Sequence, residues 1–172
     1  MEYENKEFES QTFKKLNLSN ENFTHTRFTD CTFENCNLSN ITIYNTKFQN
    51  TKFKDCKIMG IDFSKVIQLT FSPEFENCTI STCSFSSLKL PKTKFTNCQI
   101  TNTDFLDNNL INCNFENSIF KETTFYNCNL NSASFENANG YTINPTQNKL
   151  RKAKFSFPEV LSLLDEFKIE IK

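Results

Sequence analysis

The residues best suited to chemistry in this sequence are eight cysteines, one histidine and the carboxylates. No two cysteines form a Cys-x-x-Cys pair, and the closest spacing is five residues, as between Cys31 and Cys36. A zinc site built from cysteine pairs is therefore not indicated. Buried free thiols that pack as small hydrophobic side chains are the simpler interpretation, so we expect no disulfide, no metal and no cofactor.

The other reactive side chains do not form a catalytic arrangement either. A general base needs a positioned substrate and usually a second group that orients it, and His25 has no evident partner. Ser and Thr are abundant, but no nucleophile is paired with a base. With two glycines in the chain, a glycine-rich phosphate-binding loop is ruled out. The sequence predicts a protein that is not an enzyme.

Length and charge restrict the class of protein further. The chain has 172 residues, which suits one domain or one elongated repeat array. Its net charge of -1 argues against a strongly basic nucleic-acid-binding protein. The first residues lack the basic and apolar regions of a signal peptide, and no apolar run is long enough to span a membrane. We expect a cytoplasmic protein with no direct nucleic-acid or membrane partner.

Large apolar residues recur at every fifth position, a spacing that matches neither the helical period of about 3.6 nor the strand period of two. The residue two places earlier is usually small, and this small position includes every cysteine. The residue two places later is often Asn or Asp. The apolar positions form two runs, which are Phe8, Phe13, Leu18, Phe23, Phe28, Phe33, Leu38, Ile43, Phe48, Phe53, Ile58 and Phe63, and then Phe75, Ile80, Phe85, Leu90, Phe95, Ile100, Phe105, Leu110, Phe115, Phe120, Phe125, Leu130 and Phe135.

This pattern resembles the pentapeptide repeat family over about residues 6–139. The family motif is a small residue, a polar residue, a central Leu or Phe and two variable residues, and the segments 51–55 (TKFKD) and 113–117 (CNFEN) fit it directly. The resemblance implies an all-β fold, a right-handed quadrilateral parallel β-helix with four pentapeptides per coil. At roughly 4.8 Å per coil, about six coils would form a rod near 30 Å tall.

Four faces are also supported by the sequence itself. When the central residues are sorted by a period of twenty, Phe13, Phe33 and Phe53 fall on one face, and Leu18, Leu38 and Ile58 fall on the next. Like residues are expected to stack in this way where each coil packs only on its neighbours. We therefore expect the central and small side chains to point inward, with Asn at turns that need a positive φ.

The two runs are out of register. Phe63 and Phe75 are twelve residues apart, where ten would keep the register, so 64–74 (SKVIQLTFSPE) holds two extra residues or has lost three. The insertion is favoured because it places Phe75 above Phe53, and Ile80 above Leu38 and Ile58. The segment is either a widened corner or a projecting loop that binds a partner.

The end of the chain has a different pattern, so we divide the chain into a repeat domain over 1–139 and a second module over 140–172. Residues 141–153 are expected to be a linker. Ser156 and Glu159 predict a capping box for a short α-helix over about 157–167. The alternating residues 169–171 predict a short final strand.

The positions of the charged residues predict how charge is distributed over the outer surface of the rod. With the insertion included, one outward column alternates in sign and then becomes acidic, and it reads Lys14, Glu34, Lys54, Glu76, Thr96, Glu116 and Glu136. Asp104 and Asp107 add to the acidic second half, whereas lysines 47, 52, 54 and 57 form a basic band and 149–154 a basic linker. These charges either only solvate the rod or form a surface for a charged protein partner.

Within the family, the chain resembles the quinolone-resistance branch that protects topoisomerases. The shared features are the two-part stack, the segment 58–64 (IMGIDFS) before the break and the C-terminal helix. The resemblance implies a non-enzymatic DNA mimic that binds DNA gyrase or topoisomerase IV, and Glu76, Glu116, Glu136, Asp104 and Asp107 are our candidates for the contact. The alternative is a structural scaffold that presents a charged flat face to another protein. A continuous acidic face favours the mimic, and mixed charge on all faces favours the scaffold.

The C-terminal helix in that branch forms a head-to-head dimer. Here the apolar residues of the helix span more than one face, so one side can cap the last coil while the rest contacts a second chain. The candidates for the dimer interface are Val160, Leu161, Leu164 and Phe167. The alternative is a helix that only caps a monomer.

Overall fold

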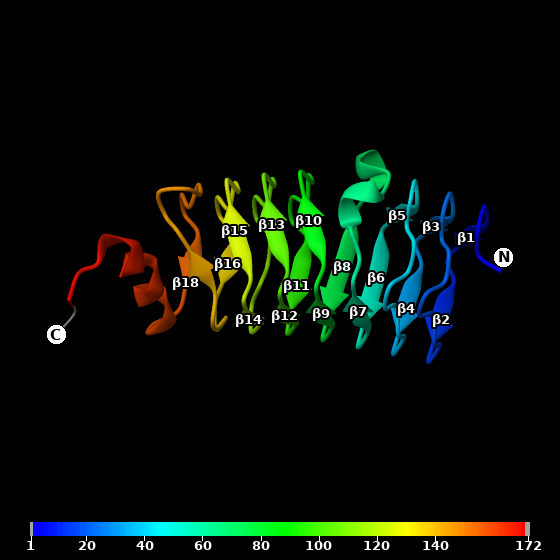
Figure 1. The fold of residues 1–172 in the computed structure, drawn as a ribbon, viewed down its shortest axis with the longest axis horizontal. Helices are drawn as coiled ribbons and strands as arrows, with labels where there is room; N and C mark the ends of the chain where they lie inside the picture. Colours follow the sequence, from blue (N-terminus) through cyan, green and yellow to red (C-terminus); the bar gives the residue numbers. More distant parts are fainter. Residues whose placement is uncertain (1, 171–172) are drawn as a thin grey trace.

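The computed structural model describes residues 2–170 and shows a rod in which the chain winds through about seven turns of a parallel β-solenoid (Figure 1). Outside residues 64–74, each turn places a short strand or a single β-bridge on each of four faces, and these elements pair in parallel with those of the next turn. The predicted four-faced parallel β-helix with a short C-terminal helix is confirmed. The turns number about seven rather than six because residues 141–155 continue the winding.

The four faces are named here A to D in the order in which the chain passes through them. Face A contains β1 (Glu7–Glu9), β3 (Arg27–Thr29) and β5 (Lys47–Gln49), and it continues through bridges at Lys89, Asn109, Asn129 and Lys149. Face B contains β2 (Thr12–Lys14), β4 (Thr32–Glu34), β6 (Thr51–Lys54), β8 (Pro73–Glu76), β11 (Lys94–Thr96), β16 (Ser134–Phe135) and β18 (Lys154–Phe155).

The other two faces complete each turn. Face C contains β7 (Lys57–Met59), β9 (Thr79–Ser81), β12 (Gln99–Thr101) and β14 (Ile119–Lys121). Face D contains β10 (Ser84–Ser86), β13 (Asp104–Leu106), β15 (Thr124–Tyr126) and β17 (Thr142–Ile143).

The interior is a stack of rings. Phe95 is fully buried and lies between Phe75 and Phe115, with ring centroids 4.9 and 5.1 Å away. Phe85 and Phe105, from face D, meet the same ring edge-on at 5.5 and 5.7 Å. Stacked and edge-to-face pairs are both favourable for aromatic rings. The repeated central Phe therefore fills the rod and fixes the register between turns.

The corners are filled by the small side chains, as predicted. All eight cysteines are free and buried. Their thiols donate to backbone carbonyls of the preceding turn, as Cys36 Sγ does to Phe13 O at 3.3 Å. Thr46 Oγ1 makes the equivalent bond to Phe23 O at 2.7 Å. The small position therefore supplies a side-chain donor for the corner carbonyls as well as filling space.

Outside the register break, the second residue after each central residue has left-handed backbone, as at Asn35 (φ 55°) and Asn97 (φ 56°). Lys92 and Glu122 adopt the same conformation, so the position tolerates several residue types. Gly140 (φ 72°) is more constrained, because a Cβ there would collide with the backbone carbonyl oxygen of Phe120. Close approach of the backbone, in addition to φ, explains glycine at this turn.

The register break is an insertion of two residues, and the alternative of a three-residue deletion is wrong. Phe53 pairs with Phe75, and Ile58 pairs with Ile80. The extra residues lie in a protrusion formed by η1 (Phe63–Lys65) and η2 (Gln68–Thr70), two short 3₁₀ helices that stand out from the rod (Figure 1). Leu69 at the protrusion is 95% exposed, so the segment is a projecting loop.

The protrusion, defined as residues 64–74, is nevertheless anchored in the rod. Phe71 is buried, with its ring 6.5 Å from that of Phe48 and 5.8 Å from that of Phe63. The backbone N–H of Ile67 donates to Thr46 O at 2.9 Å. Pairing with the preceding turn on face A therefore continues beneath the loop.

The C-terminal region differs from the expectation in three respects. The predicted linker forms a further turn, in which Ile143 pairs with Phe125 and Phe155 with Phe135. The helix is a 3₁₀ helix, η3 (Glu159–Phe167), which packs against β17. The predicted capping box is absent, because Ser156 Oγ instead accepts from the backbone N–H of Asn137 at 2.8 Å.

The predicted final strand is not formed where the structure describes it. Ile169 and Glu170 have no assigned secondary structure, and the remainder of that prediction lies outside the described residues. No helix within residues 2–170 combines the length and apolar character needed to cross a membrane.

Candidate protein-binding surface

The reactive side chains are dispersed. His25 is exposed at a turn and meets the ring of Tyr44 edge-on, with 5.9 Å between ring centroids. Among residues 2–170, no group of three or more His, Cys, Asp or Glu side chains is placed to hold a metal ion. Within the described part of the chain, the neighbour found for His25 is therefore an aromatic ring and not a carboxylate that could orient it as a base.

The thiols are poor nucleophiles in this environment. Burial raises the pKa of Cys83 to about 11 and the pKa of Cys128 to about 11. Burial also raises the pKa of Cys31 and of Cys36. Because the thiolate is the reactive form, these side chains stay protonated and unreactive near neutral pH.

Outward carboxylates on face B form the acidic column that the sequence predicted. Glu76 is exposed in β8, whereas Glu116 and Glu136 are half-buried on later turns. The hydroxyl of Ser134 lies 3.0 Å from a carboxylate oxygen of Glu116 and 3.0 Å from one of Glu136. Since a hydroxyl has one proton, it donates to one of these carboxylates at a time.

The column does not belong to a continuous acidic face, because cations lie in its first half and in the neighbouring outward column of face B. Lys14 pairs with Glu34 at 3.0 Å, and Lys94 pairs with Glu74 at 3.3 Å. Lys154, which pairs with Ser134 in the neighbouring outward column, lies 3.4 Å from Glu136. Face B therefore carries mixed charge along its length, which is the pattern that favours a scaffold.

Asp104 and Asp107 lie elsewhere. Asp104 belongs to β13 on face D, and Asp107 occupies the turn that follows it. The carboxylate of Asp107 accepts from the side-chain amide of Asn127 at 2.6 Å. Because every five residues move the chain to the next face, residues ten or so apart in sequence, such as Asp104 and Glu116, lie on different faces. The structure thus brings together three of the five predicted contact residues.

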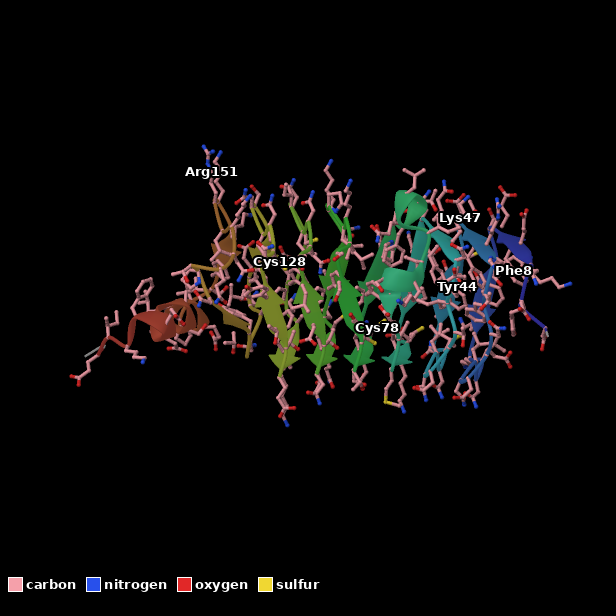
Figure 2. All side chains as sticks on the ribbon, turned by 45° about the horizontal axis from the view of Figure 1, so that its top comes forward. Phe8, Tyr44, Lys47, Cys78, Cys128 and Arg151 are labelled. Atoms are coloured by element: carbon pink, nitrogen blue, oxygen red, sulfur yellow. The ribbon has the colours of Figure 1, made fainter. Side chains whose placement is uncertain are left out.

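The basic residues gather on face A, a feature that the sequence reasoning missed. The sequence analysis grouped lysines that are close together in sequence. In the structure, a repeat of twenty residues, with the two-residue insertion taken into account, places cations from distant segments on one face. Figure 2 shows Lys47 and Arg151, far apart along the rod, toward the same upper side. The cations of face A beyond the first two turns are Lys47, Lys89, Lys92, Lys149, Arg151 and Lys152.

The apolar residues of the last helix lie partly outside the rod. Leu163 packs against the core, and Val160, Leu161 and Leu164 are half-buried. Phe167 is 54% exposed. Phe157 and Ile169, which the sequence reasoning did not select, are also exposed, at 78% and 55%. This end of the rod therefore presents apolar surface beyond what the cap requires.

Comparison with solved structures supports the architecture. A trypsin-treated variant of QnrB1, described as a plasmid-mediated fluoroquinolone resistance protein, aligns with a TM-score of 0.61 and 17% identity over 99% of this chain and 92% of that one. Full-length QnrB1 aligns with a TM-score of 0.61 and 16% identity over 97% and 92%. At these identities the likeness shows a shared fold.

Family comparison covers the repeat directly. A model of the pentapeptide repeat region matches residues 6–85, and a second model of pentapeptide repeats matches residues 109–139. None of the curated proteins matches the sequence. The two matched segments cover more than half of the chain and carry the five-residue motif that forms its faces, and the protein belongs to the pentapeptide repeat family.

Proposed function

We propose that this protein binds a type II topoisomerase, DNA gyrase or topoisomerase IV, and protects it from quinolones or toxins without catalysing a reaction. The observation that carries the proposal is the likeness to QnrB1, a fluoroquinolone resistance protein, over 99% of the chain with a TM-score of 0.61. The dispersed reactive groups and the packed interior support a role in binding rather than in catalysis. We place the action in the cytoplasm, where the eight free thiols would stay reduced.

The proposed contact surface is the acidic strip of face B, defined as Glu76, Glu116 and Glu136. Their side chains lie on the outer side of the face, and successive turns are roughly 4.8 Å apart. Regularly spaced negative charge can attract a protein groove that is built for DNA phosphates. The mimicry is limited to this strip, because Lys94 and Lys154 lie in the neighbouring outward column of the same face.

The proposed assembly is a homodimer through η3, in which Val160, Leu161, Leu164 and Phe167 contact the same surface of a second chain. A two-fold contact would bury the exposed apolar surface at this end and lengthen the rod. Replacing Leu161 and Leu164 by Ser should leave the β-helix intact and halve the mass in light scattering. A parent protein that is monomeric at micromolar concentration would refute the dimer.

A gyrase supercoiling assay with and without a quinolone tests the function. The parent protein should shift quinolone inhibition to higher drug concentration, and the triple variant E76K/E116K/E136K should lose this effect. The variant E9K/E21K/E122K has the same change in net charge but lies off the strip, so it serves as the matched control. If the strip variant protects gyrase as well as the parent, the acidic contact is wrong.

A second candidate is a scaffold that presents a charged flat face to an unrelated protein. The mixed charge of face B and the cations of face A favour it over mimicry along the whole rod. A photo-crosslinking residue at Thr96, in the middle of face B, would identify the partner in the host cell. Capture of topoisomerase subunits alone would reject the scaffold role.

A further inference from the structure

A groove of about 530 Å³ lies beside the protrusion, at the corner between faces A and B. One wall comes from η2 and the residues that follow it, and the other comes from the turn around Pro91 on face A. The strand β6 supplies a third side through Lys52. Six of the lining residues matter for the argument, which are Lys52, Leu69, Phe71, Lys89, Pro91 and Lys92.

The groove is positively charged. Lys52, Lys89 and Lys92 are exposed, and none of them makes an ion pair with another residue in the range 2–170. The only carboxylate in the lining is Glu74, and it is paired with Lys94 at 3.3 Å. The two charges of that pair offset each other, so the groove presents three cations to a ligand.

The groove also offers apolar contacts. Leu69 is 95% exposed at the rim, Pro91 is exposed on the opposite wall, and Phe71 is buried beneath them. Two polar residues of the floor are paired with each other, since the backbone N–H of Asn50 donates to Ser72 Oγ at 2.8 Å. A ligand that covers the leucine and carries negative charge near the lysines would therefore gain binding free energy from both contacts.

We propose that this groove binds an acidic, extended peptide segment of a partner protein, with carboxylates at Lys52, Lys89 and Lys92 and an apolar side chain against Leu69. A peptide fits better than a nucleic acid, because phosphates would use the lysines but leave the leucine exposed. The inference goes beyond the proposed function, since no residue of the acidic strip lines the groove, although Glu74 and Glu76 share β8, and the binding needs no topoisomerase.

Fluorescence anisotropy tests the groove with a labelled peptide of Glu and Asp residues around a central Leu. The parent should bind saturably, and K89E/K92E should weaken binding about tenfold or more, because attraction becomes repulsion at two contacts. The turn at Lys92 tolerates glutamate, since Glu122 has the same left-handed backbone. L69S should weaken binding about threefold by removing apolar contact.

The matched control is K57E/K121E, which changes net charge equally but lies on face C. The control should bind as the parent does, and circular dichroism should confirm that every variant is folded. Absence of binding by the parent would overturn the proposal, as would equal weakening by the control. A single-stranded DNA oligonucleotide that binds more tightly than the peptide, with no effect of L69S, would assign the surface to nucleic acid and also overturn it. A supercoiling assay reports on the acidic strip alone, so the two proposals can fail separately.

Discussion

The regular turns of the rod and the protrusion over residues 64–74 differ in where their large apolar side chains point. Phe95 in a regular turn is fully buried, whereas Leu69 in the protrusion is 95% exposed. In both segments the backbone forms hydrogen bonds with the preceding turn, and in the protrusion the N–H of Ile67 donates to the carbonyl oxygen of Thr46. The solenoid can therefore accept extra residues at one corner without losing its register, and it gains a projecting surface that stability does not require.

The largest expected effect comes from emptying a position in the regular turns. Phe95→Ala removes a ring that contacts four others. We expect the free energy of unfolding to fall by about 4 to 5 kcal/mol, because the neighbouring turns cannot close the cavity without losing register. Urea unfolding monitored by circular dichroism measures this change, and a loss below about 1 kcal/mol would contradict the packed interior.

A smaller loss is expected at the anchor of the protrusion. Phe71→Ala removes a buried ring that has two aromatic neighbours among residues 2–170, Phe48 and Phe63, where Phe95 has four. The free energy of unfolding should fall by about 3 kcal/mol, near the lower limit for a buried Phe. When urea concentrations are chosen so that the two variants have the same free energy of unfolding, cleavage within 64–74 should be faster in Phe71→Ala than in Phe95→Ala. Equal cleavage rates would show that Phe71 does not hold the protrusion.

Alkaline pH should affect the regular turns, because all eight cysteines belong to them and none lies in the protrusion. Burial raises the folded-state pKa of Cys83 and of Cys128 from 9.0 to about 11. The folded state then holds protons that the unfolded state releases, so stability is full below pH 9 and is lost as pH rises toward 11. Each such thiol should contribute about 1 kcal/mol of this loss by pH 10.

Two measurements check the thiols. The urea midpoint of unfolding should be lower at pH 10 than at pH 8. A thiol reagent should label the native protein far more slowly than the denatured protein. Rapid native labelling of several cysteines would contradict the buried arrangement.

The smallest effect is expected at the tip of the protrusion. Leu69→Ala should change the free energy of unfolding by less than about 0.5 kcal/mol, because an exposed side chain has little packing to lose. The same urea experiment measures it, with Phe71→Ala as the reference. A loss comparable to that of Phe71→Ala would mean that Leu69 packs against the rod.

Much of the fold could be predicted because each turn repeats one local rule. The five-residue spacing selects the interior residues, and the stacking of like residues located the insertion through pairs such as Phe53 with Phe75. The protrusion escaped prediction in its details because Val66 and Phe71 are buried without obeying the five-residue spacing. Only contacts with the preceding turn place them inside.

The surface was predicted less well because its residues come together through turns far apart in sequence. Glu76, Glu116 and Glu136 do lie in one column, since they follow the repeat on one face, and their contact with a partner stays a prediction. Asp104 was grouped with it by sequence position alone, although it lies on face D. The capping box failed because Ser156 continues the hydrogen bonding of the previous turn with Asn137, and so it is not free to cap a helix.

The most direct test of the proposed function is a binding measurement between the immobilised protein and purified DNA gyrase, with double-stranded DNA as the competitor. We expect saturable binding that DNA displaces, that is lost in E76K/E116K/E136K and that is retained in E9K/E21K/E122K. Gyrase that does not bind the parent protein, or that binds the strip variant as tightly as the parent, would contradict the proposed function.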